Sequence, residues 1–324
     1  MNWIEKCWYG NSKLVWLLLP LTWLYSLITA VRRLLFRLGI KKQHKLAVPV
    51  IVVGNITVGG TGKTPFTLML CQLLIAQGWR PGIVSRGYGA RITEPVLVTE
   101  SAKSVDVGDE PLLLAKRSGC PVVVYPGRVK AAEYLLQQTD ADIIISDDGL
   151  QHYALGRDIE IIIVDGMRGL GNQHLLPAGP LREKRWRLNL ADLVISNSQS
   201  LPYADGVMQM IPGSAKSLKS NNTLAPSAVS LVAAIGNPAR FVNTAKQAGF
   251  TLLQQHFFID HYQFTEADFS HITTPILMTE KDAVKCRHFA KADWYSLSVN
   301  AQLDPVAMTK LNTLLTQLRS TYGT

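Results

Sequence analysis

A glycine-rich loop between a strand pattern and a helix pattern constrains the fold of this chain most strongly. The loop reads GNITVGGTGKTP over residues 54–65. Before it, VPVIVV (48–53) is a continuous apolar run, which predicts a strand buried on both faces of a parallel sheet. After it, residues 64–78 place apolar residues at helical spacing and end at Gly78. A strand, a loop and a helix in this order form a phosphate-binding loop, because backbone N–H groups and the helix N-terminus attract an anion.

The loop differs from the usual pattern G-x-x-x-x-G-K-[ST] at its first glycine, because position 57 holds Thr. Its functional end is intact: we expect Lys63 to reach the β- and γ-phosphates and Thr64 to bind Mg²⁺. The competing interpretation is a glycine-rich turn without a ligand. The residues predicted to bind the nucleotide are Thr57, Val58, Gly59, Gly60, Thr61, Gly62, Lys63 and Thr64.

An acidic pair ends a second strand pattern. Residues 142–149 read DIIISDDG, so Asp147 and Asp148 follow an apolar strand, as in the acidic half of Mg²⁺–nucleotide sites. The alternative is a turn with two solvated carboxylates, since Asp and Gly are common turn residues. TEKD (279–282) is similar to the guanine-reading NKxD motif of GTPases, but one acidic loop is a weak signal for a base, and we do not assign it that role.

Strand-like and helical patterns alternate along the rest of the chain. This predicts an α/β fold with a P-loop NTPase-like, mainly parallel sheet and helices on both faces. Residues 212–227 are rich in Ser, Asn, Pro and Lys and predict a linker. The chain is therefore expected to comprise an N-terminal segment (1–45), a P-loop domain (46–211), the linker, and a smaller α/β domain with a C-terminal helix (228–324).

The N-terminal segment contains an uncharged apolar run, LVWLLLPLTWLYSLITAV, at residues 14–31. It is compatible with a signal peptide, a buried helix of a soluble protein, or a membrane-associated helix. Flanking Trp and Tyr residues and the basic stretch 32–45 favour the third interpretation and predict that the rest of the chain lies on the cytoplasmic side. Whether the helix spans the bilayer or lies in its interface stays open.

The net charge of +9 favours anionic partners such as phospholipids or phosphorylated substrates. No zinc-finger spacing, helix-turn-helix pattern or aromatic–basic RNA motif is present, so we expect no nucleic-acid partner. The 4 cysteines are scattered without a CxxC pair, which is typical of buried thiols in a reducing compartment.

Polar clusters occupy several predicted loops, and each alone is compatible with a solvated turn. They are SRGYG (85–89), VGDEP (107–111), GLQHY (149–153), PAGPLRE (177–183), IGNPARF (235–241), FIDHYQF (258–264) and TEKDAVK (279–285). The combination of GNITVGGTGKTP, SRGYG, VGDEP, DDGLQH, GPLRE, IGNPARF and DHY resembles the tetraacyldisaccharide 4′-kinase family, the lipid A 4′-kinases. The resemblance extends from the apolar N-terminus to about residue 285, and Thr at position 57 is normal for that family.

The resemblance implies an enzyme that uses ATP and Mg²⁺. Its expected reaction transfers the γ-phosphate to the 4′-hydroxyl of a tetraacyldisaccharide 1-phosphate and yields lipid IVA, a precursor of lipid A in lipopolysaccharide. The implied location is the cytoplasmic face of the bacterial inner membrane, where the acylated disaccharide lies. The oligomeric state is not predicted.

The resemblance also implies roles for individual residues. Asp109 of VGDEP is expected to be the base for the acceptor hydroxyl, oriented by His261 across a domain cleft. Arg182 is expected to stabilise the transferred phosphoryl group. Thr64 is expected to organise Mg²⁺ together with Asp147, Asp148 or Glu183, and which carboxylate binds the ion directly stays open. The residues expected to contact substrate are Arg86, Tyr88, Arg128, Gln151 and His152.

Two other functions are compatible with a phosphate-binding loop. The first is a membrane-tethered P-loop ATPase or switch that acts through a protein partner. The second is a P-loop kinase or ligase for a small soluble metabolite, which leaves the apolar N-terminus unexplained.

Overall fold

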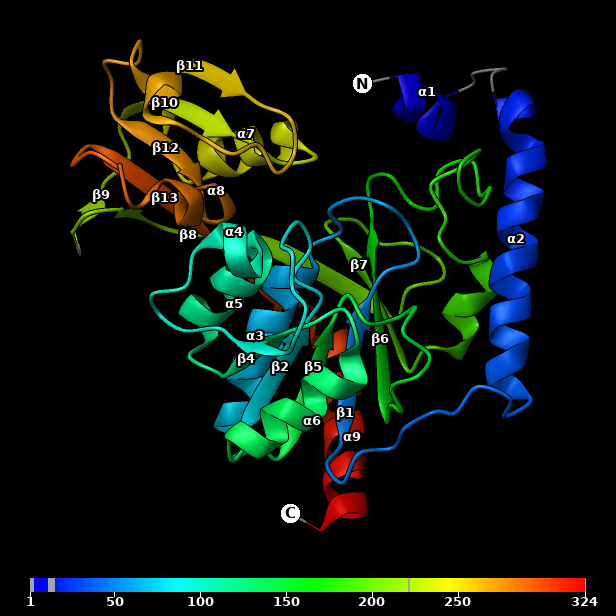
Figure 1. The fold of residues 1–324 in the computed structure, drawn as a ribbon. Helices are drawn as coiled ribbons and strands as arrows, with labels where there is room; N and C mark the ends of the chain where they lie inside the picture. The colour runs from blue at the N-terminus through cyan, green and yellow to red at the C-terminus, as the bar shows by residue number, and fades with distance from the viewer. Residues whose placement is uncertain (1–2, 11–14, 221, 324) are drawn as a thin grey trace.

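The structure, a computed structural model, describes residues 3–10, 15–220 and 222–323. A single 13-stranded sheet runs through the molecule (Figure 1) in the order β11-β10-β12-β13-β8-β7-β6-β1-β5-β2-β4-β3, with β9 paired to β8. Most neighbouring strands are parallel, as an α/β sheet requires. The predicted α/β fold with a mainly parallel sheet is confirmed.

The first unit contains the part of the sheet with the strand order β7-β6-β1-β5-β2-β4-β3. Its strands are β1 (Val50–Gly54), β2 (Pro81–Ser85), β3 (Val96–Leu97), β4 (Val122–Val124), β5 (Ile143–Asp147), β6 (Ile159–Asp165) and β7 (Leu193–Asn197). Its helices are α3 (Lys63–Ala76), α4 (Ser104–Val107), α5 (Asp109–Ser118), α6 (Arg128–Gln138) and the 3₁₀ helix η1 (Arg185–Leu190).

Alternate residues of each central strand enter cores on opposite faces of the sheet, because side chains alternate along a strand. In β1, Ile51 and Val53 pack with residues of α3 and α5, whereas Val50 and Val52 pack with residues of α6. A strand buried on both faces is apolar throughout, which explains the run VPVIVV.

The second unit is a smaller parallel sheet with two helices. It comprises β9 (Thr223–Leu224), β10 (Ala228–Ala233), α7 (Pro238–Gln247), β11 (Thr251–Phe257), η2 (Glu266–Phe269), β12 (Ile276–Thr279) and α8 (Glu280–Cys286). Two long antiparallel strands, β8 (Gly206–Ser217) and β13 (Trp294–Leu303), join it to the first unit. Their pairing extends from Met208 with Leu303 to Ser217 with Tyr295. The chain therefore enters the second unit and leaves it along two neighbouring strands.

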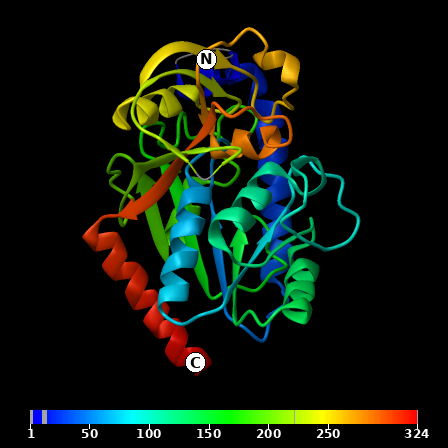
Figure 2. The ribbon, with the colours of Figure 1, turned by 90° about the vertical axis from the view of Figure 1, so that its left-hand side faces the viewer.

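Two expected boundaries differ from the structure. Residues 212–217 of the predicted linker are not a loop but the second half of β8. The C-terminal helix α9 (Pro305–Tyr322) does not pack in the second unit, because its buried residues Leu311 and Leu315 join the core beneath α3 and α5. Figure 2 shows α9 running along the first unit.

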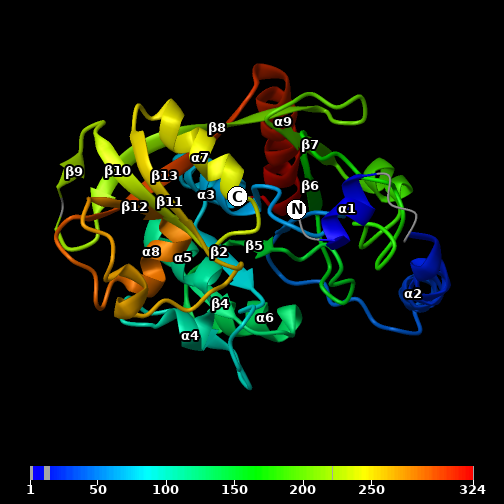
Figure 3. The ribbon, with the colours of Figure 1, turned by 90° about the horizontal axis from the view of Figure 1, so that it is seen from above.

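Two helices precede the sheet: α1 (Trp3–Tyr9) and α2 (Val15–Arg37). Seen from above in Figure 3, α2 stands at the side of the first unit opposite the second unit. By length and composition, α2 is apolar enough to cross a membrane, and only 6% of its apolar window is buried. The interpretation as a buried core helix is therefore wrong. Two hydroxyl groups attach α2 to the first unit: Thr22 Oγ1 donates to the carbonyl of Leu175, and Tyr25 Oη to that of Arg182.

Strand β2, which ends at Ser85 beside the site described below, depends on close packing between Gly82 and Leu135. A Cβ at Gly82 would lie 2.4 Å from Leu135 Cδ2. We expect Gly82→Ala to lower the free energy of unfolding by about 1–3 kcal/mol through overpacking, and Leu135→Ala by about 2–5 kcal/mol through a cavity. The double variant should lose less than the sum, because the added methyl group fills part of the cavity. Urea unfolding of the three variants measures this, and strictly additive losses would contradict the packing argument.

Candidate active site

The glycine-rich loop leaves the carboxyl end of β1 and enters α3 at Lys63. Gly62 has φ 97°, and a Cβ there would lie 2.7 Å from Asn197 Nδ2, so this position requires glycine. Asn197 Nδ2 in turn donates to the Thr61 carbonyl at 2.8 Å. A Cβ at Gly59 or Gly60 would meet nothing within 4 Å. The inner side of the loop is therefore fixed by protein contacts, and its outer side is open.

Thr57 lies where the usual pattern has its first glycine. It is buried and forms an isolated β-bridge with Leu181, while the N–H of Val58 donates to the Pro180 carbonyl at 2.8 Å. The φ angle of Thr57 is not positive. Threonine is compatible with this position because the loop here is extended backbone that pairs with the GPLRE segment.

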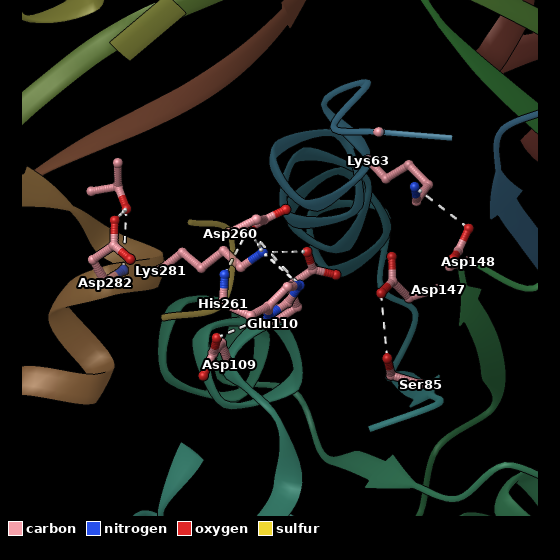
Figure 4. Close-up of polar contacts among 12 residues, drawn as sticks. Lys63, Ser85, Asp109, Glu110, Asp147, Asp148, Asp260, His261, Lys281 and Asp282 are labelled. Carbon is pink, nitrogen blue, oxygen red and sulfur yellow. Dashed lines mark hydrogen bonds and ion pairs between the residues drawn. The ribbon is translucent and has the colours of Figure 1, made fainter. Parts of the chain in front are cut away.

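The two aspartates at the end of β5 lie beside the loop (Figure 4). Lys63 Nζ is 3.4 Å from Asp148 Oδ1, and Arg182 Nη1 is 3.2 Å from Asp148 Oδ2. Asp147 points the other way, where its Oδ2 accepts from Ser85 Oγ at 3.4 Å. The structure thus brings the predicted Lys63, Asp147, Asp148 and Arg182 together.

The pKa values of the two carboxyl groups are shifted in opposite directions. Complete burial raises the pKa of Asp147 to about 7, and the carboxylates of Glu110 and Asp148 act in the same direction. Burial also acts to raise the pKa of Asp148, but the charges of Lys63 and Arg182 outweigh it and lower the pKa to about 2. Asp148 is therefore an anion at neutral pH, whereas Asp147 needs a nearby cation to become fully ionised.

The donor set beside the loop fits Mg²⁺. Asp147 Oδ1 is buried without a hydrogen-bond partner, and oxygen atoms are the ligands that Mg²⁺ prefers. Across the described residues, no group of three or more His, Cys, Asp or Glu could hold a metal. Mg²⁺ commonly binds one or two carboxylates together with substrate phosphates, and the metal roles of Asp147, Asp148 and the Thr64 hydroxyl stay predictions.

Glu183, a predicted Mg²⁺ ligand, faces other groups. It is only 2% exposed and accepts hydrogen bonds from Tyr153 Oη and, at 3.0 Å, from Gln151 Nε2. Arg187 Nε lies 3.5 Å from Glu183 Oε2 and Arg33 Nη1 lies 3.9 Å from it. Both oxygens of the Glu183 carboxylate therefore have protein partners. The contact with Arg33 also connects α2 to the site. A metal role for Glu183 stays a prediction.

A second cluster lies where α5 meets the second unit. Asp109, at the start of α5, is 4% exposed, and its Oδ2 is 3.2 Å from His261 Nδ1 (Figure 4). The ring of Tyr88 lies 5.1 Å from the His261 ring, centroid to centroid. Although 152 positions separate them in sequence, Asp109 and His261 are in contact, as the resemblance implied. His261 has a φ of 62°, a left-handed conformation uncommon for a non-glycine residue.

The other predicted substrate contacts differ in position. Arg86 and Tyr88 are exposed. Arg128 is buried, and its Nη2 donates to the Asp147 carbonyl at 3.1 Å. Gln151 bonds Glu183, and His152 is half-buried. Through this contact with the Asp147 carbonyl, Arg128 stabilises the end of β5. The substrate roles predicted for all five residues stay predictions.

Sequence reasoning missed the residues by which the second unit contacts the first. Arg240 of IGNPARF donates through Nη1 to the Gly60 carbonyl at 3.2 Å, and its Nη2 is 2.7 Å from Asp165 Oδ2. Lys281 of TEKDAVK contacts Glu110 at 3.3 Å. Both clusters had been singled out as polar loops, but only the fold reveals their partners.

Comparisons with known proteins agree with this geometry. A profile of the tetraacyldisaccharide-1-P 4′-kinase family (LpxK) matches residues 14–317. The chain belongs to this family. Relatives named tetraacyldisaccharide 4′-kinase include that of Shewanella sp. strain MR-7, 50% identical over 313 residues that cover 93% of this chain and 92% of the relative. That of Shewanella amazonensis is 46% identical over 329 residues, which cover 96% and 94%.

A solved structure shares the fold. The crystal structure of LpxK from Aquifex aeolicus in complex with ATP has a TM-score of 0.78 and 29% identity, and it covers 94% of this chain and 99% of that chain. The family assigned from motifs is thereby confirmed.

The half-buried His152 leads to a prediction on acid stability. Burial, followed by the positive charges of Arg128 and Arg32, lowers the pKa of His152 to about 4. Between about pH 6.5 and 4 the unfolded state binds a proton that the folded state does not, so stability falls as pH falls through this window. We expect the melting temperature of His152→Gln to decrease less than that of the wild type from pH 7 to pH 4.5. The exposed His174→Gln variant is the control; equal decreases in all three proteins would refute the assignment.

Proposed function

We propose that this protein is a tetraacyldisaccharide 4′-kinase that transfers the γ-phosphate of ATP to the 4′-hydroxyl of a tetraacyldisaccharide 1-phosphate. The product is lipid IVA, in lipid A biosynthesis. The observation that carries the proposal is a phosphate-binding loop with Lys63 and Asp148 in the same unit as Asp109, whose carboxylate is contacted by His261 of the second unit. The family and the ATP complex of its Aquifex aeolicus member support the same reaction.

The first cluster binds and neutralises the phosphates. Lys63 and the N–H groups of the loop hold the β- and γ-phosphates, and Lys63 exchanges its contact with Asp148 for the nucleotide. Arg182, bonded to Asp148, lies at the same end of the loop to stabilise charge on the transferred group. Mg²⁺, when bound by Asp147, Asp148 and Thr64, supplies further positive charge.

The second cluster prepares the acceptor. Asp109 takes the proton of the 4′-hydroxyl as the sugar oxygen bonds to the γ-phosphorus. The bond between that phosphorus and the bridging oxygen breaks, and its electron pair stays on ADP. His261 orients the Asp109 carboxylate through Nδ1. Because Asp109 and the loop belong to the first unit and His261 to the second, the relative placement of the units controls how His261 orients the base.

We also infer that the enzyme works at the cytoplasmic face of the bacterial inner membrane. The exposed side of α2 carries large apolar residues, including Trp16, Trp23 and Leu27. Each CH₂ group withdrawn from the bilayer costs about 0.8 kcal/mol, so a tetraacylated substrate stays in the membrane and the enzyme must come to it. The contacts of Tyr25 with the Arg182 carbonyl and of Arg33 with Glu183 hold this helix next to the active site.

The rival function, a membrane-tethered ATPase that acts through a protein partner, uses the same loop. In that function the Asp109–His261 pair would activate water, so the two functions differ in whether the γ-phosphate is found on lipid or as free phosphate.

A transfer assay tests the kinase directly. Protein in detergent micelles receives γ-labelled ATP, Mg²⁺ and tetraacyldisaccharide 1-phosphate, and label is followed into the lipid. We expect Lys63→Ala to lower kcat by about 10²–10³-fold, because it removes a donor to the transferred phosphate. Asp109→Asn should lower kcat by about 10²–10⁴-fold with little change in KM for ATP, because it removes the base and leaves the loop intact. ATP hydrolysis without lipid labelling would instead support the rival function.

Flotation with vesicles tests the role of α2. We expect the wild type to float with vesicles that contain anionic lipid, and the triple variant Trp16→Glu, Leu24→Glu, Ile28→Glu to float at least tenfold less. Each large side chain contributes roughly 1.5–3 kcal/mol when buried. Val306 on α9 is 68% exposed, so Val306→Glu is the matched control. Equal flotation of wild type and triple variant would argue against membrane binding through α2.

A further inference from the structure

Helix α8, which carries the TEKDAVK motif, is attached firmly to α5. Thr279 caps α8 by accepting from the N–H of Asp282 at 3.1 Å. Glu280 Oε2 of α8 lies 2.5 Å from Arg117 Nη1 at the other end of α5. The motif thereby fixes the position of its two lysines, Lys281 and Lys285, relative to the Asp109–His261 pair.

The ammonium group of Lys281 faces three acceptors. Its Nζ lies 3.3 Å from His261 Nε2, 3.3 Å from Glu110 Oε1 and 3.4 Å from Asp260 Oδ1 (Figure 4). Burial would lower the pKa of Lys281, but the carboxylates of Glu110 and Asp260 outweigh it and raise the pKa, so the amine is charged. An ammonium has three protons to donate and cannot accept, so His261 Nε2 must present its lone pair to it.

This contact determines where the imidazole proton lies. With Nε2 as the acceptor, a neutral His261 carries its proton on Nδ1, and that N–H donates to Asp109 Oδ2 at 3.2 Å. A protonated imidazole would turn a second N–H toward the ammonium at 3.3 Å. Asp260 Oδ1 is 4.0 Å from Nε2, beyond hydrogen-bond distance, and Tyr88 contributes only its ring face.

Lys285 acts on the other member of the pair. Its side chain is 1% exposed, and its Nζ lies 2.9 Å from Asp282 Oδ1 and 3.6 Å from Asp109 Oδ2. Asp282 is itself occupied, because its Oδ2 accepts from the N–H of Ala234 and from Thr279 Oγ1. Asp109 Oδ2 therefore faces the His261 N–H and a buried ammonium together. Asp109 Oδ1 has no partner within the described ranges 3–10, 15–220 and 222–323.

We propose that Lys281 and Lys285 are positioning residues that hold His261 as the neutral Nδ1–H tautomer and Asp109 as a carboxylate with Oδ1 free. This inference rests on the proposed kinase function and names the atom that acts in it. The 4′-hydroxyl proton passes to Asp109 Oδ1, the sugar oxygen bonds to the γ-phosphorus, and the broken P–O bond leaves its electrons on ADP. His261 keeps its Nδ1 proton and holds Oδ2.

The first experiment reads the tautomer without any turnover. The full chain is labelled with ¹⁵N-histidine, and the His261 signals are identified by their loss in His261→Gln. We expect a protonated Nδ1 and an unprotonated Nε2 in the wild type at pH 7.5. In Lys281→Met, His261 Nε2 loses its donor, so we expect part of the His261 population to move to the Nε2–H tautomer, seen as a weaker Nδ1–H signal. Lys281→Arg should retain the wild-type spectrum, and the exposed Lys246→Met is the control.

A wild-type His261 protonated on Nε2, or a Lys281→Met spectrum identical to that of the wild type, would overturn the proposal. This result is independent of the transfer assay, in which failure of the kinase function itself appears as unlabelled lipid with wild-type protein. When the lipid is labelled, Lys281→Met should lower kcat with KM for ATP unchanged.

The second experiment tests Lys285. Because Lys285→Gln alone would leave Asp282 buried without its cation, the double variant Asp282→Asn, Lys285→Gln removes both charges. We expect kcat to fall at least tenfold with KM for ATP and the melting temperature unchanged, because Asp109 Oδ2 loses the ammonium that lies 3.6 Å from it. A kcat within twofold of the wild type, in protein with an unchanged melting temperature, would contradict the role of Lys285. A lowered melting temperature with the same loss of kcat would assign Lys285 to folding and likewise overturn the proposal.

Discussion

The parallel pairing of β1 with β5 is the constraint on which the nucleotide site depends. It places Val53 opposite Asp147, so the glycine-rich loop and the acidic pair leave the same edge of the sheet one strand apart. The loop alone would attract phosphate, and the acidic pair alone would be a charged turn. Their adjacency lets Lys63 contact Asp148. It also leaves Asp147 buried, and the positive charges of Lys63 and Arg128 only partly offset the burial that raises its pKa.

Charge connects this site to the one across the units. Glu110 follows Asp109 in α5; its carboxylate contacts Lys281 of the second unit and also raises the pKa of Asp147. A change in the charge around Asp147 therefore also changes the electrostatic potential at the cluster of Asp109, His261 and Lys281. Arg240 adds a direct contact, because it bonds the Gly60 carbonyl of the loop from the second unit. The units are coupled both by electrostatics and by hydrogen bonds.

The sequence predicts local features of this site well, because they depend on neighbouring residues. The loop, its flanking strand and helix, and the Asp147–Asp148 pair all follow from patterns a few residues long. The contact of Asp109 with His261 came from family resemblance, since no local pattern relates them. Glu183 shows the limit: its contacts with Tyr153 and Gln151 form only on folding, and no local pattern predicts them.

The error at residues 212–217 has a different cause. In this half of β8 the buried positions Ala215 and Ser217 hold small or polar residues, so it lacks the apolar alternation by which strands are recognised. Its partner β13 stabilises it through backbone hydrogen bonds, which no composition reveals. Helix α9 was assigned to the second unit because it follows that unit in the sequence. Its buried leucines pack instead in the core of the first unit.

The adjacency of β8 and β13 has a consequence for how the protein is built. The chain leaves the first unit along β8 and returns along the neighbouring β13, and α9 then completes the first core. In topological terms, the second unit is an insertion into one hairpin of a P-loop domain. Its two ends are next to each other, so a tight turn at that point would close the chain without disturbing the strands beneath. The His261 side of the Asp109–His261 pair is thus carried by an inserted module, while Asp109 and the phosphate-binding loop belong to the domain that receives it.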